Sequence, residues 1–226
     1  MSSRTTGTTA CAVAALTCLT IGGCSDPTVD LDSPDADKKI EALRRCARQP
    51  DDEVVERVAE VVSHRDTMVA AEAVRSLGRM GHPKAVDVLK EVAGVGKHRH
   101  SALRREAVIQ LGRQREAREE VLPVLRQCLK EDADPRVRAA AALSISRQRS
   151  LVDAPLLMET AETEPDPVVQ TRAVRAVERL VGMRFRYDPT APKAQRDAAL
   201  RRMRRVATRV AANLKRWREH RKNKAP

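Results

Sequence analysis

Apolar residues recur three or four positions apart through most of the stretch 36–182, a spacing typical of amphipathic helices. The pattern also repeats on a longer scale, because the segments 67–80, 102–115, 136–149 and 167–180 can be aligned with one another. In that alignment a small residue falls in the same place in each segment, at Ala73, Ala107, Ala141 and Ala173. Segment 37–47 is a degenerate first copy. The chain is therefore predicted to contain five copies of one helical unit, with a period of 31 to 34 residues.

Each of the first four copies continues into a second apolar run, so the repeating unit is predicted to be a pair of helices. These second runs cover residues 54–62, 86–92, 121–129 and 156–161. Aspartates suited to cap a helix precede three copies, and two of them are followed by proline, at Asp66, Asp134-Pro135 and Asp166-Pro167. Glycines expected at helix ends are Gly78, Gly81 and Gly112.

The core of such a protein has to be built from small aliphatic side chains. The 226 residues include only three aromatic ones, Phe185, Tyr187 and Trp217. Alanine, valine and leucine suit closely packed helices, which favours an all-α protein. One helix pair cannot bury both of its apolar faces, whereas neighbouring pairs stacked in a row can.

The stretch DPRVRAAAALSI, which begins at Asp134, resembles the HEAT repeat. It is most similar to the short variety shared with phycobiliprotein-lyase-like proteins, whose pattern is Asp, Val-Arg, Ala-Ala and Leu-Gly. Val137-Arg138 fits this pattern, whereas the second and third copies keep Leu-Gly and lack Val-Arg. The resemblance covers residues 36–182 and implies an α-solenoid of about five HEAT-like helical hairpins, followed by a long basic C-terminal helix. An irregular helical bundle is the alternative.

The N-terminal residues 1–23 have the features of an export signal. Their apolar run, residues 10–21, is too short to cross a bilayer as a helix but matches the central region of a signal peptide. Residues 21–24, Ile-Gly-Gly-Cys, resemble the bacterial lipobox. That resemblance implies cleavage before Cys24, lipidation of its thiol and anchoring in the cell-envelope membrane, with residues 24–35 as a linker. An ordinary signal cleaved elsewhere, or a cytosolic protein with an apolar start, are the alternatives.

The positive charge of the chain is concentrated at its C-terminal end. The net charge is +12, and residues 193–226 contain 13 Lys and Arg against Asp197 and Glu219. After a proline-containing linker, 183–193, residues 194–226 are predicted to form a basic helix and tail. An apolar seam runs along this helix from Leu200 to Trp217, and its candidate binding residues are Arg201, Arg202, Arg204, Arg205, Arg209 and Arg216.

Three interpretations of this basic helix remain open. Its seam could cap the solenoid while the arginines face water. The arginines could instead bind anionic lipid or polysaccharide, since Lys and Arg near a negative membrane surface contribute about 1 kcal/mol each. A basic helix is also a weak signal for nucleic acid, but an exported protein rarely meets DNA or RNA.

Residues with catalytic or metal-binding spacing are missing from the sequence. There is no HExxH, no CxxC and no glycine-rich phosphate loop, and His98-Arg99-His100 lacks a third ligand nearby. Cys46 and Cys128 fall in copies too far apart to form a disulfide, so both are expected to be unpaired. No cofactor, metal or catalytic activity is expected. The predicted function is a lipid-anchored scaffold for another envelope protein; a polyanion binder and, more remotely, a lyase-like enzyme are the alternatives.

Overall fold

The computed structural model describes residues 26–98 and 100–222, which form ten α-helices, two short 3-10 helices and no strand. The first helices of the five hairpins are α1 (Ala36–Cys46), α3 (Thr67–Met80), α5 (Ser101–Leu111), α7 (Pro135–Arg147) and α9 (Pro167–Val181). The second helices are α2 (Asp52–Val61), α4 (Pro83–Ala93), α6 (Arg118–Glu131), α8 (Ala154–Thr163) and α10 (Lys193–Lys222). The 3-10 helices are η1 (Val29–Asp32) and η2 (Leu151–Asp153).

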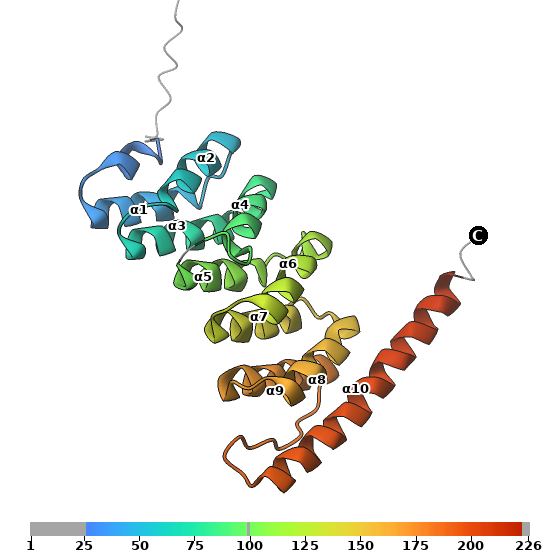
Figure 1. The fold of residues 1–226 in the computed structure, drawn as a ribbon. Helices are drawn as coiled ribbons and strands as arrows, with labels where there is room; N and C mark the ends of the chain where they lie inside the picture. Colours follow the sequence, from blue (N-terminus) through green and yellow to red (C-terminus); the bar gives the residue numbers. More distant parts are fainter. Residues whose placement is uncertain (1–25, 99, 223–226) are drawn as a thin grey trace, which may run out of the picture.

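The hairpins stack in chain order into an open solenoid (Figure 1). Helices α1, α3, α5, α7 and α9 lie on one side of the stack, and the second helices lie on the other. Within the described ranges, the extensive helix contacts join members of one hairpin or of neighbouring hairpins. The predicted solenoid is thereby confirmed, and the irregular bundle is excluded.

Short-range hydrogen bonds fix where the helices begin and end. Asp66, Asp134 and Asp166 each accept a hydrogen bond from a backbone N–H two residues later, at 2.8 Å, as predicted for N-caps. Gly81 ends α3 in the left-handed conformation, with φ of 63°. The prediction for Gly78 is wrong, because Gly78 lies inside α3.

Gly78 is needed where α3 meets α5. A Cβ atom at this position would lie 2.4 Å from Oε1 of Gln110, so only glycine lets that side chain approach. Gly112 ends α5 as predicted and allows a similar approach to α7, because an added Cβ would lie 2.5 Å from Oγ of Ser144.

The core contains the small aliphatic side chains that the sequence suggested. The four equivalent alanines are all inaccessible to solvent, at Ala73, Ala107, Ala141 and Ala173. Among the described residues, Cys46 and Cys128 are buried and unpaired, as predicted. The thiol of Cys128 donates to the carbonyl of Ala93, and burial raises its pKa to about 12.

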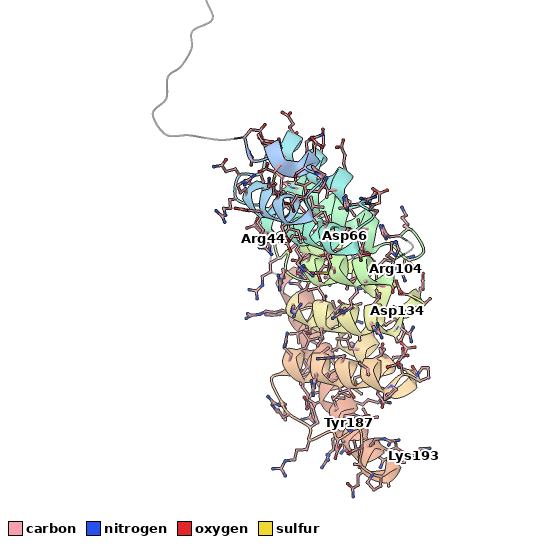
Figure 2. The ribbon with its side chains drawn as sticks, turned by 90° about the vertical axis from the view of Figure 1, so that its left-hand side faces the viewer. Arg44, Asp66, Arg104, Asp134, Tyr187 and Lys193 are labelled. Atoms are coloured by element: carbon pink, nitrogen blue, oxygen red, sulfur yellow. The ribbon has the colours of Figure 1, made fainter. Side chains whose placement is uncertain are left out.

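Two buried ion pairs connect neighbouring hairpins. Each joins the first helix of one hairpin to the loop before the first helix of the next hairpin. Arg104 in α5 donates to both carboxylate oxygens of Asp132 at 2.8 Å. Arg138 in α7 forms the same bidentate interaction with Glu164. Figure 2 shows Arg104 and Asp134, which begins the next first helix, along one edge of the stack. These pairs fix the register between neighbouring hairpins.

The two ends of the solenoid are closed by η1 and by α10, which is both the predicted C-terminal helix and the second helix of the fifth hairpin. At the N-terminal end, η1 packs on the first hairpin, where Leu31 is buried and Asp30 pairs with Arg45. At the C-terminal end, α10 packs on α8 and α9, and its seam residues Leu200, Met203 and Ala207 are buried. The first half of α10 therefore caps the solenoid, as one of the three interpretations expected.

The connector between α9 and α10 is fixed by its aromatic residues. Phe185 is buried, and its backbone N–H donates to Oε1 of Glu178 at 2.8 Å. The Tyr187 hydroxyl donates to Oε1 of Gln170 at 2.5 Å. In the described part of the chain, no helix is both long enough and apolar enough to span a bilayer.

Candidate functional site

The packing of α10 determines which of its arginines are available for binding. Because Leu200, Met203 and Ala207 face the solenoid, the positions between them face solvent. The six residues of the predicted site are all exposed: Arg201, Arg202, Arg204, Arg205, Arg209 and Arg216. The structure does not bring all six together.

Two of the predicted arginines are already engaged within the molecule. Arg204 forms an ion pair with Glu162 of α8, a contact that helps to hold α10 against the solenoid. Arg216 donates to Oδ1 of Asn213 at 2.8 Å, one turn earlier on α10. Arg201 is exposed but does not line the cavity described next.

The other three predicted arginines, Arg202, Arg205 and Arg209, line an open cavity of about 540 Å³ between α10 and the connector 183–186. Arg184 and Arg186 of the connector line the same cavity, and the apolar part of its wall comes from Met183, Phe185 and Val206. None of the five guanidinium groups forms an ion pair or a hydrogen bond with a side chain in the described ranges.

The connector places its two arginines beside the helix because of what surrounds Phe185. Gly182 ends α9 with φ of 71°, and Phe185 turns into the core directly afterwards. The neighbours of Phe185 on either side, Arg184 and Arg186, are therefore exposed. Arg186 adopts a φ of 53°, an uncommon value for a residue with a side chain.

Five guanidinium groups around one cavity make a strongly positive site. Guanidinium groups recognise carboxylate and phosphate oxygens through paired hydrogen bonds, so the arrangement suits an anionic ligand. The sequence prediction missed Arg184 and Arg186. The alternation Arg-Phe-Arg-Tyr was the available signal, because burying the aromatic residues exposes the arginine between them.

Other predicted features fall outside this cavity or outside the described residues. Cys24, the predicted lipidation site, lies outside the described ranges, as do Arg99 and the side chain of Trp217. The rings of His98 and His100 are 5.7 Å apart. Among the described residues, no group of three or more His, Cys, Asp or Glu side chains is placed to hold a metal ion.

The stacked hairpins and the ion pairs between neighbouring hairpins define an α-solenoid. A model of the family described as HEAT repeats matches residues 25–98 and 95–178, which together are more than half of the chain. The chain belongs to the HEAT-repeat family. HEAT repeats commonly serve as scaffolds for protein interaction.

Comparison with solved structures gives distant similarities. An engineered protein is 18% identical, with a TM-score of 0.47, over 80% of this chain and 94% of that chain. Human deoxyhypusine hydroxylase in complex with glycerol is 14% identical, with a TM-score of 0.32, over 83% of each chain. Both TM-scores are below 0.5, so the family assignment rests on the family model. No curated protein matches the chain.

Proposed function

We propose that this protein is an exported, lipid-anchored scaffold of the bacterial cell envelope that binds another envelope protein and is not catalytic. The observation that carries the proposal is the row of stacked first helices, α1 to α9, which forms one continuous lateral surface of a HEAT-repeat solenoid. Solenoids of this kind use such extended surfaces for binding. Because η1 and α10 cover the two ends, the sides are the surfaces left for a partner.

The proposed anchor would hold the first hairpin close to the membrane. Lipidated Cys24 is separated by only four residues from η1, which is packed against α1 and α2. A fully extended chain reaches at most about 3.6 Å per residue, so η1 would lie within about 18 Å of the lipidated residue. The solenoid would then extend outward from its first hairpin, with α10 at the far end.

Lipidation is tested by metabolic labelling and fractionation of cells that produce the full chain or its Cys24→Ser variant. We expect labelled palmitate in the full chain and in a Cys46→Ser control, and none in Cys24→Ser, which should leave the membrane fraction. Equal labelling of Cys24→Ser, or no labelling of any variant, would overturn the anchor.

The scaffold function is tested by affinity capture from solubilised membranes, using the mature chain as bait. We expect recovery of a specific envelope protein that remains bound when the arginines of α10 are replaced. A partner lost only with those arginines would favour the second candidate below. Recovery of no protein, even after crosslinking in intact cells, would contradict the scaffold function.

A second candidate is a peripheral binder of anionic lipid or polysaccharide, favoured by the five unpaired arginines around the α10 cavity. Deleting residues 193–226 would uncover buried core residues, so charge reversal is the cleaner test. Arg205→Glu with Arg209→Glu should weaken binding to phosphatidylglycerol vesicles by more than about tenfold, since each basic residue contributes about 1 kcal/mol. Arg48→Glu, at an exposed site on the first hairpin, is the matched control. Unchanged vesicle binding by the double variant would exclude this candidate.

A further inference from the structure

A second cavity lies on the lateral surface of the solenoid, across the helices α5, α7 and α9. Its volume is about 510 Å³, and it shares no lining residue with the cavity at α10. Its floor is apolar and comes from all three helices, at Ile109, Ala139, Ala140, Leu143 and Val168. Four arginines complete its lining, at Arg105, Arg136, Arg147 and Arg172. We name this feature the lateral groove.

The guanidinium groups of the lateral groove are not neutralised within the part of the chain that the structure describes. None of the four forms an ion pair or a side-chain hydrogen bond there. The pKa of Arg147 is lowered, first by burial and then by the neighbouring positive charges of Arg113 and Arg179. Asp134, which caps α7 by accepting the backbone N–H of Arg136, interacts with the positive charge of Arg136 but forms no ion pair with its guanidinium group.

On the same side of the solenoid, arginines near the N-terminal end are bound by a carboxylate. There, the buried carboxylate of Glu72 binds three arginines, Arg44, Arg75 and Arg79, at 3.3, 3.0 and 2.6 Å. Burial raises the pKa of Glu72, but its bonds to these arginines outweigh burial, and the net effect lowers the pKa. Arg75 also lies 3.6 Å from Glu106 of α5. These three arginines of the N-terminal half are thus paired within the molecule, whereas the four of the lateral groove are not.

The apolar floor also lacks a covering side chain. Val168, at the start of α9, is 57% exposed, and Ile109 and Leu143 are half-buried. An apolar strip bordered by unpaired positive charge matches a ligand that carries both apolar and negatively charged groups. A simple inorganic anion would leave the floor exposed to water, and an apolar ligand would leave the arginines unpaired.

We propose that the lateral groove binds an acidic segment of another protein, in which carboxylate side chains alternate with apolar ones. This inference rests on the scaffold function and names the binding surface and the chemistry of the partner. Three stacked helices, about 8–10 Å apart, span about 20 Å. An extended segment rises about 3.3 Å per residue, so about six residues cross the groove.

The geometry assigns complementary roles to the two kinds of side chain in that segment. Successive side chains of an extended segment point to opposite sides, so one set reaches the floor at Ile109 and Leu143. The carboxylates then reach the arginines at the edges, where Arg147 and Arg172 can each bind one through paired hydrogen bonds. Binding also relieves the repulsion among the positive charges around Arg147.

The direct test measures binding of fluorescent eight-residue peptides to the full chain in mild detergent, by fluorescence anisotropy. We expect the peptide of alternating Glu and Leu to bind, and peptides of Lys and Leu or of Glu and Ser to bind at least about tenfold more weakly. The variant Arg147→Glu/Arg172→Glu should weaken Glu-Leu binding at least about tenfold, as expected for two lost charge pairs. Arg48→Glu should have no effect, and circular dichroism confirms that each variant is folded.

Three outcomes would overturn the inference: no binding of the Glu-Leu peptide, equal binding of the Glu-Ser peptide, or full binding by the double variant. Photo-crosslinking in cells separates this failure from failure of the scaffold function. A crosslinker at Leu143 lies in the lateral groove, and one at Val88 of α4 lies on the other side of the stack.

An acidic, apolar-containing segment of a different protein should be crosslinked at Leu143 and not at Val88. A partner crosslinked only at Val88 would leave the scaffold function intact and refute the lateral groove. A neutral or basic segment, or a second copy of this chain, at Leu143 would also refute the proposed partner. No crosslinked protein at either position would contradict both proposals.

Discussion

Removal of the Asp132 carboxylate should destabilise the solenoid more than removal of any exposed charge. Both oxygens of Asp132 accept hydrogen bonds from Arg104 at 2.8 Å, and one of them also accepts the Asp134 N–H at 2.9 Å. The side chains of Asp132 and Arg104 are 0% and 9% exposed, so neither charge is screened by water. In Asp132→Ala the guanidinium would stay buried, with the carbonyl of His98 as its one remaining acceptor.

The expected loss is about 3–5 kcal/mol of unfolding free energy, the range for removing one partner of a buried ion pair. A guanidinium group is not deprotonated in proteins, so Arg104 cannot lose its proton to avoid the penalty. The double variant Asp132→Ala/Arg104→Leu removes the uncompensated charge and should be more stable than the single variant.

The assay is urea denaturation followed by far-ultraviolet circular dichroism. Glu56→Ala is the matched control, because Glu56 also joins neighbouring hairpins through Lys84, at 2.9 Å, but both side chains are largely exposed. That control should lose less than about 1 kcal/mol. A loss below about 1 kcal/mol for Asp132→Ala, or a double variant no more stable than the single one, would refute this reasoning.

Three further predictions follow from the packing and the shifted pKa values. Gly112→Ala should cost about 1–3 kcal/mol in urea denaturation, because the new Cβ, 2.5 Å from Oγ of Ser144, forces α5 and α7 apart; an unchanged midpoint would contradict this. The pKa of Glu72 is lowered from 4.5, so its carboxylate stabilises the fold above that pH and the benefit is lost as the pH falls. Glu72→Gln should therefore cost about 1–3 kcal/mol at neutral pH and flatten the acid side of the stability profile; a parallel profile would argue against it. Cys128, with a pKa of about 12, should react with a thiol reagent only after unfolding, and rapid labelling of the native chain would show that its burial is wrong.

Much of the fold could be predicted from the sequence because stacking reuses one local pattern. The equivalent alanines, the capping aspartates and the period of the repeat each reflect a contact within a hairpin or with its neighbour. The prediction failed where a residue is required by packing against the neighbouring hairpin and not by the end of its own helix. Gly78 was expected to end a helix, but it makes room for Gln110 from the next hairpin.

The ion pairs illustrate a second limit of motif matching. The third copy lacks the Val-Arg pair of the family pattern, since it has Leu103-Arg104 at that place. Leu103 nevertheless fills the same buried position as Val137, and Arg104 forms the same kind of bidentate ion pair as Arg138. This ion pair requires the arginine and an acidic residue before the first helix of the next hairpin. It does not require valine in place of leucine directly before the arginine.

The binding surfaces were harder to predict than the core. Three of the six candidate arginines do line one cavity, but the other two arginines of that cavity lie in a connector. The lateral groove was not predicted, because its arginines lie on three helices about one repeat apart in sequence. Their proximity arises only from the stacking of those helices.

Because the extensive contacts of each hairpin, in the part of the chain that the structure describes, are with its neighbours, the solenoid acts as a spacer whose length changes in whole units. A duplicated segment 101–134 would bring its own Arg104–Asp132 pair and leave both covered ends unchanged. Each added unit would move α10 about 10 Å further from η1. The number of hairpins therefore sets the distance between the N-terminal segment and the arginines of α10.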